Sequence, residues 1–254
     1  MENLICIKNH VLGTGKPLVC VPIMDDKKDT ILQTAKSLVD SGIEMIEWRV
    51  DAFAMAKDLN AIREVLEGLK PIMKETIFLY TFRSKMQGGQ MEIEADEIID
   101  LHQVAAESGV VDLIDLEYFE AEHPDKEIRN LHKSGVYVIA SHHDFEETPK
   151  AEVMQMLLEQ MTESGADVVK LAVMPKNEED VLALLRETSH FHKNHPDRPL
   201  ITMSMGKLGG ISRIAGETFG SCVTFGAGAV ASAPGQFPNE RLEQMLEWIH
   251  ESMK

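Results

Sequence analysis

Cysteine is scarce in this sequence, and its spacing excludes two classes of structure. The 254 residues contain three cysteines, Cys6, Cys20 and Cys222, which lie far apart and include no C-x-x-C pair. An odd number of widely spaced thiols favours neither a disulfide framework nor a zinc site. We expect all three to be small apolar core residues in a reducing compartment.

Long apolar runs are absent as well. No window reaches the roughly 20 apolar residues of a membrane-spanning helix. The first residues lack the basic segment and the apolar stretch of a signal peptide. The sequence therefore predicts a cytoplasmic protein.

Basic side chains are outnumbered, since 25 Lys and Arg stand against 42 Asp and Glu, which gives a formal net charge of −17. A nucleic-acid groove requires an excess of basic side chains. We therefore expect no nucleic-acid partner and no binding to an anionic membrane surface. With 44% hydrophobic and 26% charged residues, the composition is that of a globular protein with a sizeable core.

Short apolar runs alternate with longer stretches of helical periodicity. There are eight such runs, at Leu18–Ile23, Met45–Val50, Ile77–Phe82, Val111–Leu116, Val136–Ala140, Val168–Met174, Leu200–Met203 and Cys222–Phe225. Between them, stretches such as residues 31–39 and 59–69 place apolar side chains on one face at helical spacing. Alternating strands and helices favour parallel pairing through right-handed crossovers.

Turn residues mark where several of these helices begin and end. Four helices are expected to end at the same dipeptide, namely Ser41-Gly42, Ser108-Gly109, Ser134-Gly135 and Ser164-Gly165. Glycine there can adopt the left-handed conformation that terminates a helix. Thr148 followed by Pro149 predicts an N-cap with proline at the first helical position.

Eight strand and helix units in a chain of this length favour a closed (β/α)8 TIM barrel, an α/β fold, with one domain over residues 1–254. An open doubly wound sheet would more often carry a G-x-G-x-x-G turn after its first strand. This sequence has Met24-Asp25-Asp26 there instead. Residues 4–8 and 11–15 are expected to form an N-terminal β-hairpin that closes the barrel floor.

Charged residues gather at the ends of the predicted strands, where (β/α)8 enzymes carry their active sites. The two-residue period of the second strand puts Glu47, Arg49 and Asp51 on one face, opposite its apolar side chains. Further polar residues end the following strands: Arg83, Asp115, Glu117, His142, His143 and Asp144. These carboxylates and histidines could bind a divalent metal, but lysine and arginine side chains in the same mouth would repel one.

Lys170 is the most unusual residue, because apolar residues flank it in the middle of a predicted buried strand. Such a lysine must pair with an acid, reach solvent or lose its charge. Neighbouring arginines would lower its pKa and give an amine able to attack a carbonyl, as Schiff-base catalysis requires. A buried ion pair with Glu47, Asp115 or Glu117 explains the pattern equally well.

His142 and His143 are adjacent, so only one of them can face the barrel mouth while the strand continues. A histidine that titrates near neutrality can take and return a proton, which suits an elimination reaction. For any one of ten histidines, however, a surface position or a satisfied core position is the more common outcome.

Glycine-rich loops follow the last two predicted strands, at residues 205–213 and 226–236. In many barrels these two loops form an anion cradle from backbone N–H groups, and Arg213 adds a planar donor for a carboxylate or phosphate. The alternative is that the glycines only make tight turns. Met203 and Met205 are expected to form an apolar wall.

Seven motifs in order along the chain resemble those of type I 3-dehydroquinate dehydratases. They are EWRVD at 47–51, FRS at 82–84, HHDF at 142–145, KLAVM at 170–174, TMSM at 202–205, ISR at 211–213 and ASAPGQ at 231–236. The resemblance covers nearly the whole chain. Seven ordered motifs are far more specific than any one of them.

The resemblance implies a cofactor-free, usually homodimeric barrel enzyme with a small-molecule substrate and no metal. Such a hydro-lyase removes water from 3-dehydroquinate to give 3-dehydroshikimate in the shikimate pathway of aromatic amino-acid biosynthesis. By the same resemblance, Lys170 forms an imine with the substrate ketone, and His143 moves the protons of a syn elimination. The implied substrate-binding residues are Arg213, Ser232 and Gln236 for the carboxylate, Glu47, Arg49 and Arg83 for the ring hydroxyls, and Met203, Met205 and Phe225 as apolar walls.

One position departs from the family pattern, because this chain has Gln87 where several members place a glutamate that partners the histidine. Gln87 is therefore the expected partner of His143. An amide can orient the imidazole but cannot stabilise its cation as a carboxylate does. We expect a lower His143 pKa than in relatives that carry the glutamate.

Two other functions would use the same residues. A class I aldolase acting on a phosphorylated sugar would use Lys170 and the two glycine-rich loops, and phosphate would compete for its site. A non-catalytic barrel would bind an anionic metabolite without forming an imine, with Lys170 held in a buried ion pair.

Overall fold

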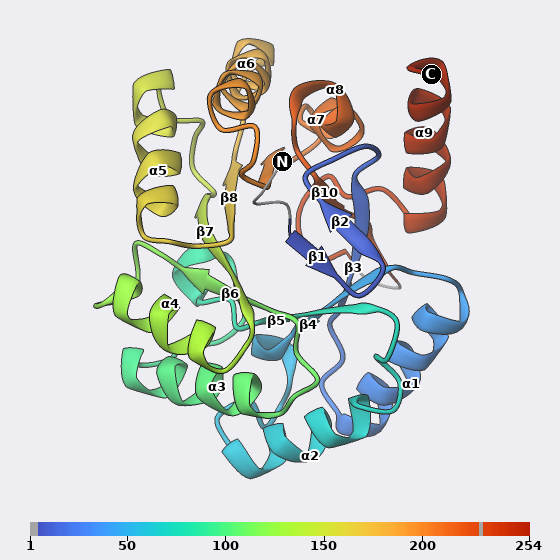
Figure 1. Cartoon of the computed structure of the whole chain (residues 1–254), viewed down its shortest axis with the longest axis vertical. Coiled ribbons are helices and arrows are strands. Elements are labelled where there is room, and N and C mark those ends of the chain that lie inside the picture. The colour runs from blue at the N-terminus through green and yellow to red at the C-terminus, as the bar shows by residue number, and fades with distance from the viewer. Residues whose placement is uncertain (1–4, 229–230) are drawn as a thin grey trace.

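Eight parallel strands form the centre of the computed structural model, which describes residues 5–228 and 231–254 (Figure 1). The strands are β3 (Leu18–Ile23), β4 (Met45–Arg49), β5 (Ile77–Thr81), β6 (Leu113–Glu117), β7 (Tyr137–Asp144), β8 (Val168–Val173), β9 (Leu200–Ser204) and β10 (Val223–Phe225). They pair in the order β10-β3-β4-β5-β6-β7-β8-β9. An isolated bridge between Leu200 and Ser221 joins the two ends of the sheet. Each predicted apolar run is a strand, and the predicted TIM barrel is confirmed.

Helices surround the strands on the outside (Figure 1). They are α1 (Lys28–Asp40), α2 (Leu59–Leu69), α3 (Ala95–Glu107), α4 (Pro124–Lys133), α5 (Ala151–Glu163), α6 (Glu178–Asn194), α7 (Gly210–Ile214), α8 (Gly216–Phe219) and α9 (Asn239–Ser252), with 3-10 turns η1 (Val50–Ala52) and η2 (Lys85–Gln87). Within the described part of the chain, none of them is both long enough and apolar enough to cross a membrane.

The alternation of side chains along each strand separates two apolar cores. Ile46 and Trp48 of β4 point outward into the core between the strands and the helices. Met45 points inward, where it packs with Ile77 and Leu113 at the amino ends of their strands. The inward positions nearer the carboxyl ends are polar instead, which places charged side chains at one end of a barrel whose floor is apolar.

The N-terminal hairpin closes that floor. Strands β1 (Ile5–Ile7) and β2 (His10–Leu12) are antiparallel, and their inward side chains are buried against the inner core. Lys8 ties the hairpin to the barrel, because its Nζ lies 2.7 Å from the Asp112 carboxylate and donates to two backbone carbonyls before β5. The predicted hairpin is confirmed over these strands, and residue 4 lies outside the described residues.

Four of the five predicted helix ends are found at the expected turn residues, and one is not. Each predicted Ser-Gly dipeptide ends a helix, with serine as the C-cap and glycine at a φ between 67° and 87°. The expected N-cap at Thr148 with Pro149 is wrong, because α5 begins at Ala151 after Lys150. The Thr148 hydroxyl donates instead to the Met174 carbonyl at 3.1 Å, so a tertiary contact occupies the group that would have capped the helix.

The cysteines are not all core residues. Cys20 and Cys222 are buried, as expected, but Cys6 is exposed. In β1 the buried residues are Ile5 and Ile7, so the two-residue period turns Cys6 outward. The prediction of a core position for Cys6 is therefore wrong.

Candidate active site

Lys170 lies inside the barrel on β8. Its neighbours Val169 and Leu171 pack outward, so the alternation of the strand turns the lysine inward. Its Nζ lies 3.0 Å from Oδ2 of Asp115 on β6 and 4.5 Å from the centre of the Phe225 ring. The buried ion pair that the sequence left open is present. Because Lys170 also lines the central cavity, the ion pair does not remove it from contact with a ligand.

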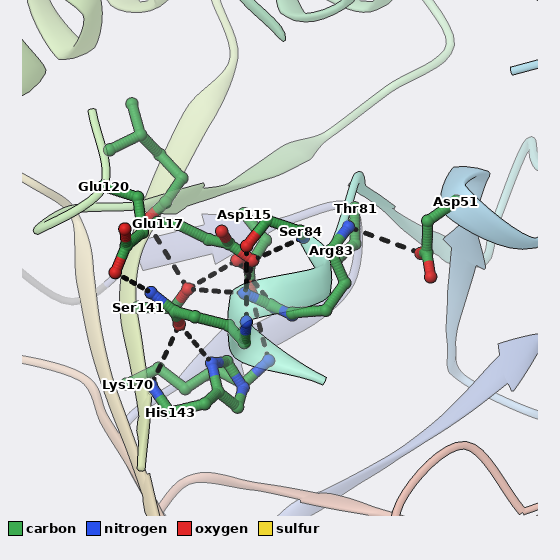
Figure 2. A network of polar contacts seen from close by, with 12 residues as sticks. Asp51, Thr81, Arg83, Ser84, Asp115, Glu117, Glu120, Ser141, His143 and Lys170 are labelled. Atoms are coloured by element: carbon green, nitrogen blue, oxygen red, sulfur yellow. Dashed lines mark hydrogen bonds and ion pairs between the residues drawn. The ribbon is translucent and has the colours of Figure 1, made fainter. Parts of the chain in front are cut away.

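Asp115 is the centre of a buried network of charges (Figure 2). Arg83 lies 2.8 Å from Asp115 and 2.9 Å from Glu117, and the Ser141 hydroxyl donates to Asp115 at 2.6 Å. Burial alone would raise the pKa of the Asp115 carboxyl, but Arg83 and Lys170 outweigh it and hold that pKa far below its usual range. Asp115 therefore stays ionised and holds two cations side by side beneath the cavity.

The length of β7 decides which of two histidines faces the cavity. The strand continues to Asp144, so neighbouring side chains alternate through both histidines. His143 lines the cavity, while the His142 ring packs edge-on against Phe119, with ring centres 5.2 Å apart. The expectation that only one of them faces the mouth holds, and it is His143.

Gln87 fixes the proton on the His143 ring. Its Oε1 lies 3.0 Å from both the backbone nitrogen and Nδ1 of His143. A backbone N–H can only donate, so the amide atom facing it is assigned as the oxygen. An amide oxygen only accepts, so Nδ1 of the neutral ring carries its hydrogen. Nε2 is thereby left with a free lone pair for proton transfer.

The surroundings of His143 favour its neutral form. Burial is the main cause, and the cationic Arg83, Lys170 and Arg49 add to it, while Asp115 opposes them. Together they hold the pKa of His143 well below its usual range. At neutral pH His143 is therefore a base rather than a cation.

Of the three charged residues predicted to share one face of the second strand, two reach the cavity. Glu47 accepts a hydrogen bond from Thr81 at 2.8 Å, and both Glu47 and Arg49 line the cavity. Asp51 does not, because the strand ends at Arg49 and Asp51 lies in η1. It instead accepts from Arg49 Nε at 2.7 Å and from two backbone N–H groups, one of them that of Arg83. The expectation that three charges share one face is wrong for Asp51, which orients Arg49 from behind.

The loop after β10 brings two polar side chains to the cavity. Gln236 Nε2 donates to the Ser232 hydroxyl at 2.9 Å, and its Oε1 accepts from the Ser232 backbone N–H at 2.8 Å. Because the Ser232 oxygen already accepts, its own hydroxyl hydrogen remains available to a ligand.

Arg213 stands behind this loop rather than in the cavity wall. It is 1% exposed, and its guanidinium donates to the Pro234 carbonyl at 3.0 Å. Its Nε has no partner among the described residues. Burial lowers the pKa of Arg213 to about 10, so it keeps its charge at neutral pH, and none of the carboxylates that the structure describes forms an ion pair with it. A buried, uncompensated cation favours an anionic ligand on the cavity side of the loop.

Comparison with known proteins agrees with this arrangement. The model of the type I 3-dehydroquinase family matches residues 19–253. The 3-dehydroquinate dehydratase of Clostridioides difficile (strain 630) is 43% identical over 254 residues, covering all of both chains. That of Bacillus subtilis (strain 168) is 38% identical over 253 residues, covering 99% of each.

The chain belongs to the type I 3-dehydroquinase family.

Solved structures of the family have the same fold. The Clostridium difficile type I 3-dehydroquinate dehydratase, with covalently modified comenic acid, superposes with a TM-score of 0.95 at 42% identity, covering all of both chains. The Geobacillus kaustophilus enzyme superposes with a TM-score of 0.95 at 34% identity, covering 100% of this chain and 98% of that one.

The cavity lies at the carboxyl ends of the barrel strands. Its lining includes the expected residues Glu47, Arg49, Arg83, Gln87, His143, Lys170, Met203, Met205, Phe225, Ser232 and Gln236. Of the catalytic and substrate-binding residues that the family resemblance implies, Arg213 alone is not part of the lining. Within the described residues, no three histidine, cysteine or carboxylate side chains are placed to hold a metal ion.

Sequence reasoning missed Phe145, which also lines the cavity. Its ring stacks on that of His143, with centres 6.4 Å apart and planes 21° apart. It also packs so closely on Gly88 that a Cβ there would lie 2.3 Å from the ring. Phe145 follows His143 by two residues, so the period that turns the histidine inward was the signal that could have found it.

Proposed function

We propose that this chain removes water from 3-dehydroquinate to give 3-dehydroshikimate through an imine on Lys170. The observation that carries the proposal is a buried primary amine in the cavity wall, together with a histidine whose Nε2 is free. The covalently modified ligand in the Clostridium difficile relative supports covalent chemistry in this family.

Lys170 would act as nucleophile and electron sink. Its ammonium group passes a proton to the substrate ketone as the nitrogen attacks the carbonyl carbon. A second proton from the same nitrogen then passes to the carbinolamine oxygen, which leaves as water and gives an iminium ion. Asp115 holds the lysine chain in place before attack, and His143 is a neutral base in the same cavity. The iminium ion draws electrons from the adjacent C–H bond, so the reaction needs no cofactor.

His143 would move the proton of the elimination. Its Nε2 removes the proton next to the iminium carbon, the C–H electron pair forms a C=C bond to that carbon, and the π electrons of the C=N bond move onto nitrogen to give an enamine. The enamine then expels the ring hydroxyl, which leaves as water with the proton from His143, on the same face. A second water hydrolyses the product imine and restores the Lys170 amine.

The remaining lining residues would bind the substrate. The Ser232 hydroxyl and the Gln236 amide are donors for the carboxylate, with the charge of Arg213 behind them. Glu47, Arg49 and Arg83 would bind the ring hydroxyls. Met203, Met205 and Phe225 would form the apolar walls around the ring.

Several broader statements belong to the same proposal. A cytoplasmic homodimer serving the shikimate pathway of aromatic amino-acid biosynthesis accords with the family resemblance. One domain over residues 1–254 accords with a barrel whose last helix, α9, packs on β3.

Reductive trapping tests the function. The protein is incubated with 3-dehydroquinate and sodium borohydride, which reduces an imine to a stable secondary amine, and its intact mass and peptides are measured. We expect a substrate-derived adduct on Lys170 and none on the Lys170→Ala variant. A folded protein that forms no adduct, under conditions that label another imine-forming enzyme, contradicts the proposal.

A further inference from the structure

The amide that holds His143 is itself held from its other end. Gln87 is buried at the end of η2, and its backbone N–H donates to the Ser84 hydroxyl at 3.3 Å. Its Nε2 donates to Oε1 of Glu120, also at 3.3 Å. Glu120 lies in the loop after β6 and is exposed, and this hydrogen bond to Gln87 connects it to the site.

The carboxylate of Glu120 selects one orientation of the Gln87 amide. Two N–H groups of His143 require the amide oxygen on their side, because a flipped amide would face them with its NH2 group. Glu120 accepts and never donates when ionised, so it requires the NH2 group on its own side. Both ends of the amide therefore favour the same orientation.

We propose that Glu120 is a positioning residue for the dehydration reaction, because its contact with Gln87 keeps the His143 ring with Nε2 free. The inference rests on the proposed function, since it assigns no new reaction. It explains why an amide stands at position 87 in this chain, since a carboxylate there would face the carboxylate of Glu120.

The same geometry makes the two positions interdependent. In Gln87→Glu alone, two carboxylates would meet where an amide and a carboxylate now bond, which is unfavourable. In the Q87E/E120Q double variant, the amide at position 120 can donate to the carboxylate at position 87. That carboxylate can then accept from Nδ1 of His143 and stabilise its cation.

Other charges around the two histidines stay the same in these variants. His143 faces Arg83, Lys170 and Arg49 as cations and Asp115 as the anion. The neighbouring His142 faces Asp144, Glu120 and Glu117. Loss of the Glu120 charge therefore also removes one of three anions near His142, which an NMR titration resolves separately from His143.

The experiment measures kcat and KM as functions of pH for the full chain and its Glu120→Ala, Glu120→Gln, Gln87→Glu and Q87E/E120Q variants. We expect Glu120→Ala to lower kcat by about three- to ten-fold with little change in KM, as the loss of one hydrogen bond predicts. Glu120→Gln should retain most of kcat, because an amide oxygen still accepts from Gln87. Glu122→Ala, which removes a second exposed carboxylate from the same loop, is the matched control and should match the unmodified protein.

The double variant gives the sharpest outcome. We expect Q87E/E120Q to have a higher kcat than Gln87→Glu and to move the acidic limb of its pH profile to higher pH than in the unmodified chain. Equal losses in Glu120→Ala and Glu120→Gln, or a Gln87→Glu phenotype that Glu120→Gln leaves unchanged, would overturn the proposal. An unmodified chain without any turnover would contradict the function instead, which keeps the two failures distinct.

Discussion

At the scale of single residues, the chemistry depends on two inward positions of adjacent strands. Lys170 and Ser141 are direct partners in the register of β7 and β8, and His143 lies two residues further along β7. The parallel pairing therefore places the amine and the base on the same inner surface near the mouth. Asp115 on the next strand completes the arrangement by fixing the lysine.

Replacement of His143 separates imine formation from the proton removal that follows it. In His143→Ala, Lys170 remains to form the imine, but no group takes the proton from the adjacent carbon. We expect kcat to fall by about two to four orders of magnitude, with the imine accumulating. Intact mass after borohydride reduction measures the accumulation, with Lys170→Ala as the unlabelled control. Equal, mild losses in both variants would show that neither residue takes part in the chemistry.

The lowered pKa values of His143 and Asp115 predict how stability depends on pH. In both cases the unfolded chain binds the proton more tightly than the folded chain, so the free energy of unfolding decreases as pH falls. The loss of stability that His143 causes begins as the pH falls below about 6.5, and the loss that Asp115 causes begins below about pH 4, which are the ordinary pKa values of the two groups.

Thermal unfolding from pH 8 to pH 5 measures the His143 contribution. The Tm of the unmodified chain should fall across this range by more than the Tm of His143→Ala. A constant difference between the two across the range would show that the pKa of His143 is not lowered by folding.

A site residue could be predicted from the sequence where the two-residue period of its own strand determines that its side chain points inward. The period of β8 turns Lys170 inward, and this period appears in the sequence alone. For β7 the period predicts only that one of His142 and His143 faces the mouth, and the choice of His143 came from the family resemblance. The choice of Asp115 as the lysine partner, among three carboxylates, depends on which strands are neighbours. The Glu120 contact with Gln87 joins two loops, and no local pattern predicts it.

At the scale of elements, the loops after β9 and β10 support each other. Gly206 N donates to the Pro234 carbonyl at 3.1 Å, and Gly235 packs directly on the Gly206 backbone. The second loop carries Ser232 and Gln236, so its position is set by the first. The glycines are therefore more than tight turns, because they allow close backbone approach between the two loops.

Gly235→Ala tests this support. A Cβ at Gly235 would lie 2.1 Å from the Gly206 carbonyl oxygen, so the loop must move. We expect KM for 3-dehydroquinate to rise by about ten-fold or more, with a smaller effect on kcat. Gly165→Ala is the control, because Gly165 also has a positive φ, of 87°, but has open space around its Cβ position. It should lower stability and leave KM unchanged; a similar KM in both variants would contradict the argument.

Strands and helix ends could be predicted where local sequence signals determine them. The predictions were wrong where a tertiary contact engages the residue that carries the local signal. The eight apolar runs and the four Ser-Gly helix ends all have local causes, and all were found. The N-cap of α5 was not, because the Thr148 hydroxyl bonds to the chain after β8. Asp51 left the expected face for a related reason, since backbone N–H groups of later segments hold it in η1.

At the scale of the whole molecule, stability and chemistry lie at opposite ends of the barrel. The hairpin and Lys8 close the floor, whereas Lys170 and His143 act at the mouth. Three cations and one carboxylate line the mouth, although the molecule carries a formal charge of −17. Local charges, rather than the net charge, therefore determine which ligand enters.

Lys8→Met tests whether the stability of the barrel floor is independent of the activity at the mouth. The variant keeps the apolar stem but leaves two backbone carbonyls without the Lys8 donor, and the Asp112 carboxylate keeps only the backbone N–H of Phe78. We expect the free energy of unfolding to fall by about 1–3 kcal/mol, with kcat and KM unchanged at temperatures where the variant is folded. Urea denaturation and steady-state kinetics on the same preparation check both statements. A loss of kcat in the folded variant would show that floor and mouth are coupled.

The joint between β9 and β10 has a further consequence for how such an enzyme can change. The sheet closes there through an isolated bridge, and the loops on either side of this joint hold Ser232, Gln236 and Arg213. Lys170 and His143 lie instead on β8 and β7, which pair continuously with each other, and β8 also pairs continuously with β9. Recognition of the substrate anion and formation of the imine are thus modular. Directed evolution toward a different anionic ketone can concentrate on residues 205–213 and 231–236 while the reactive amine and its base remain untouched.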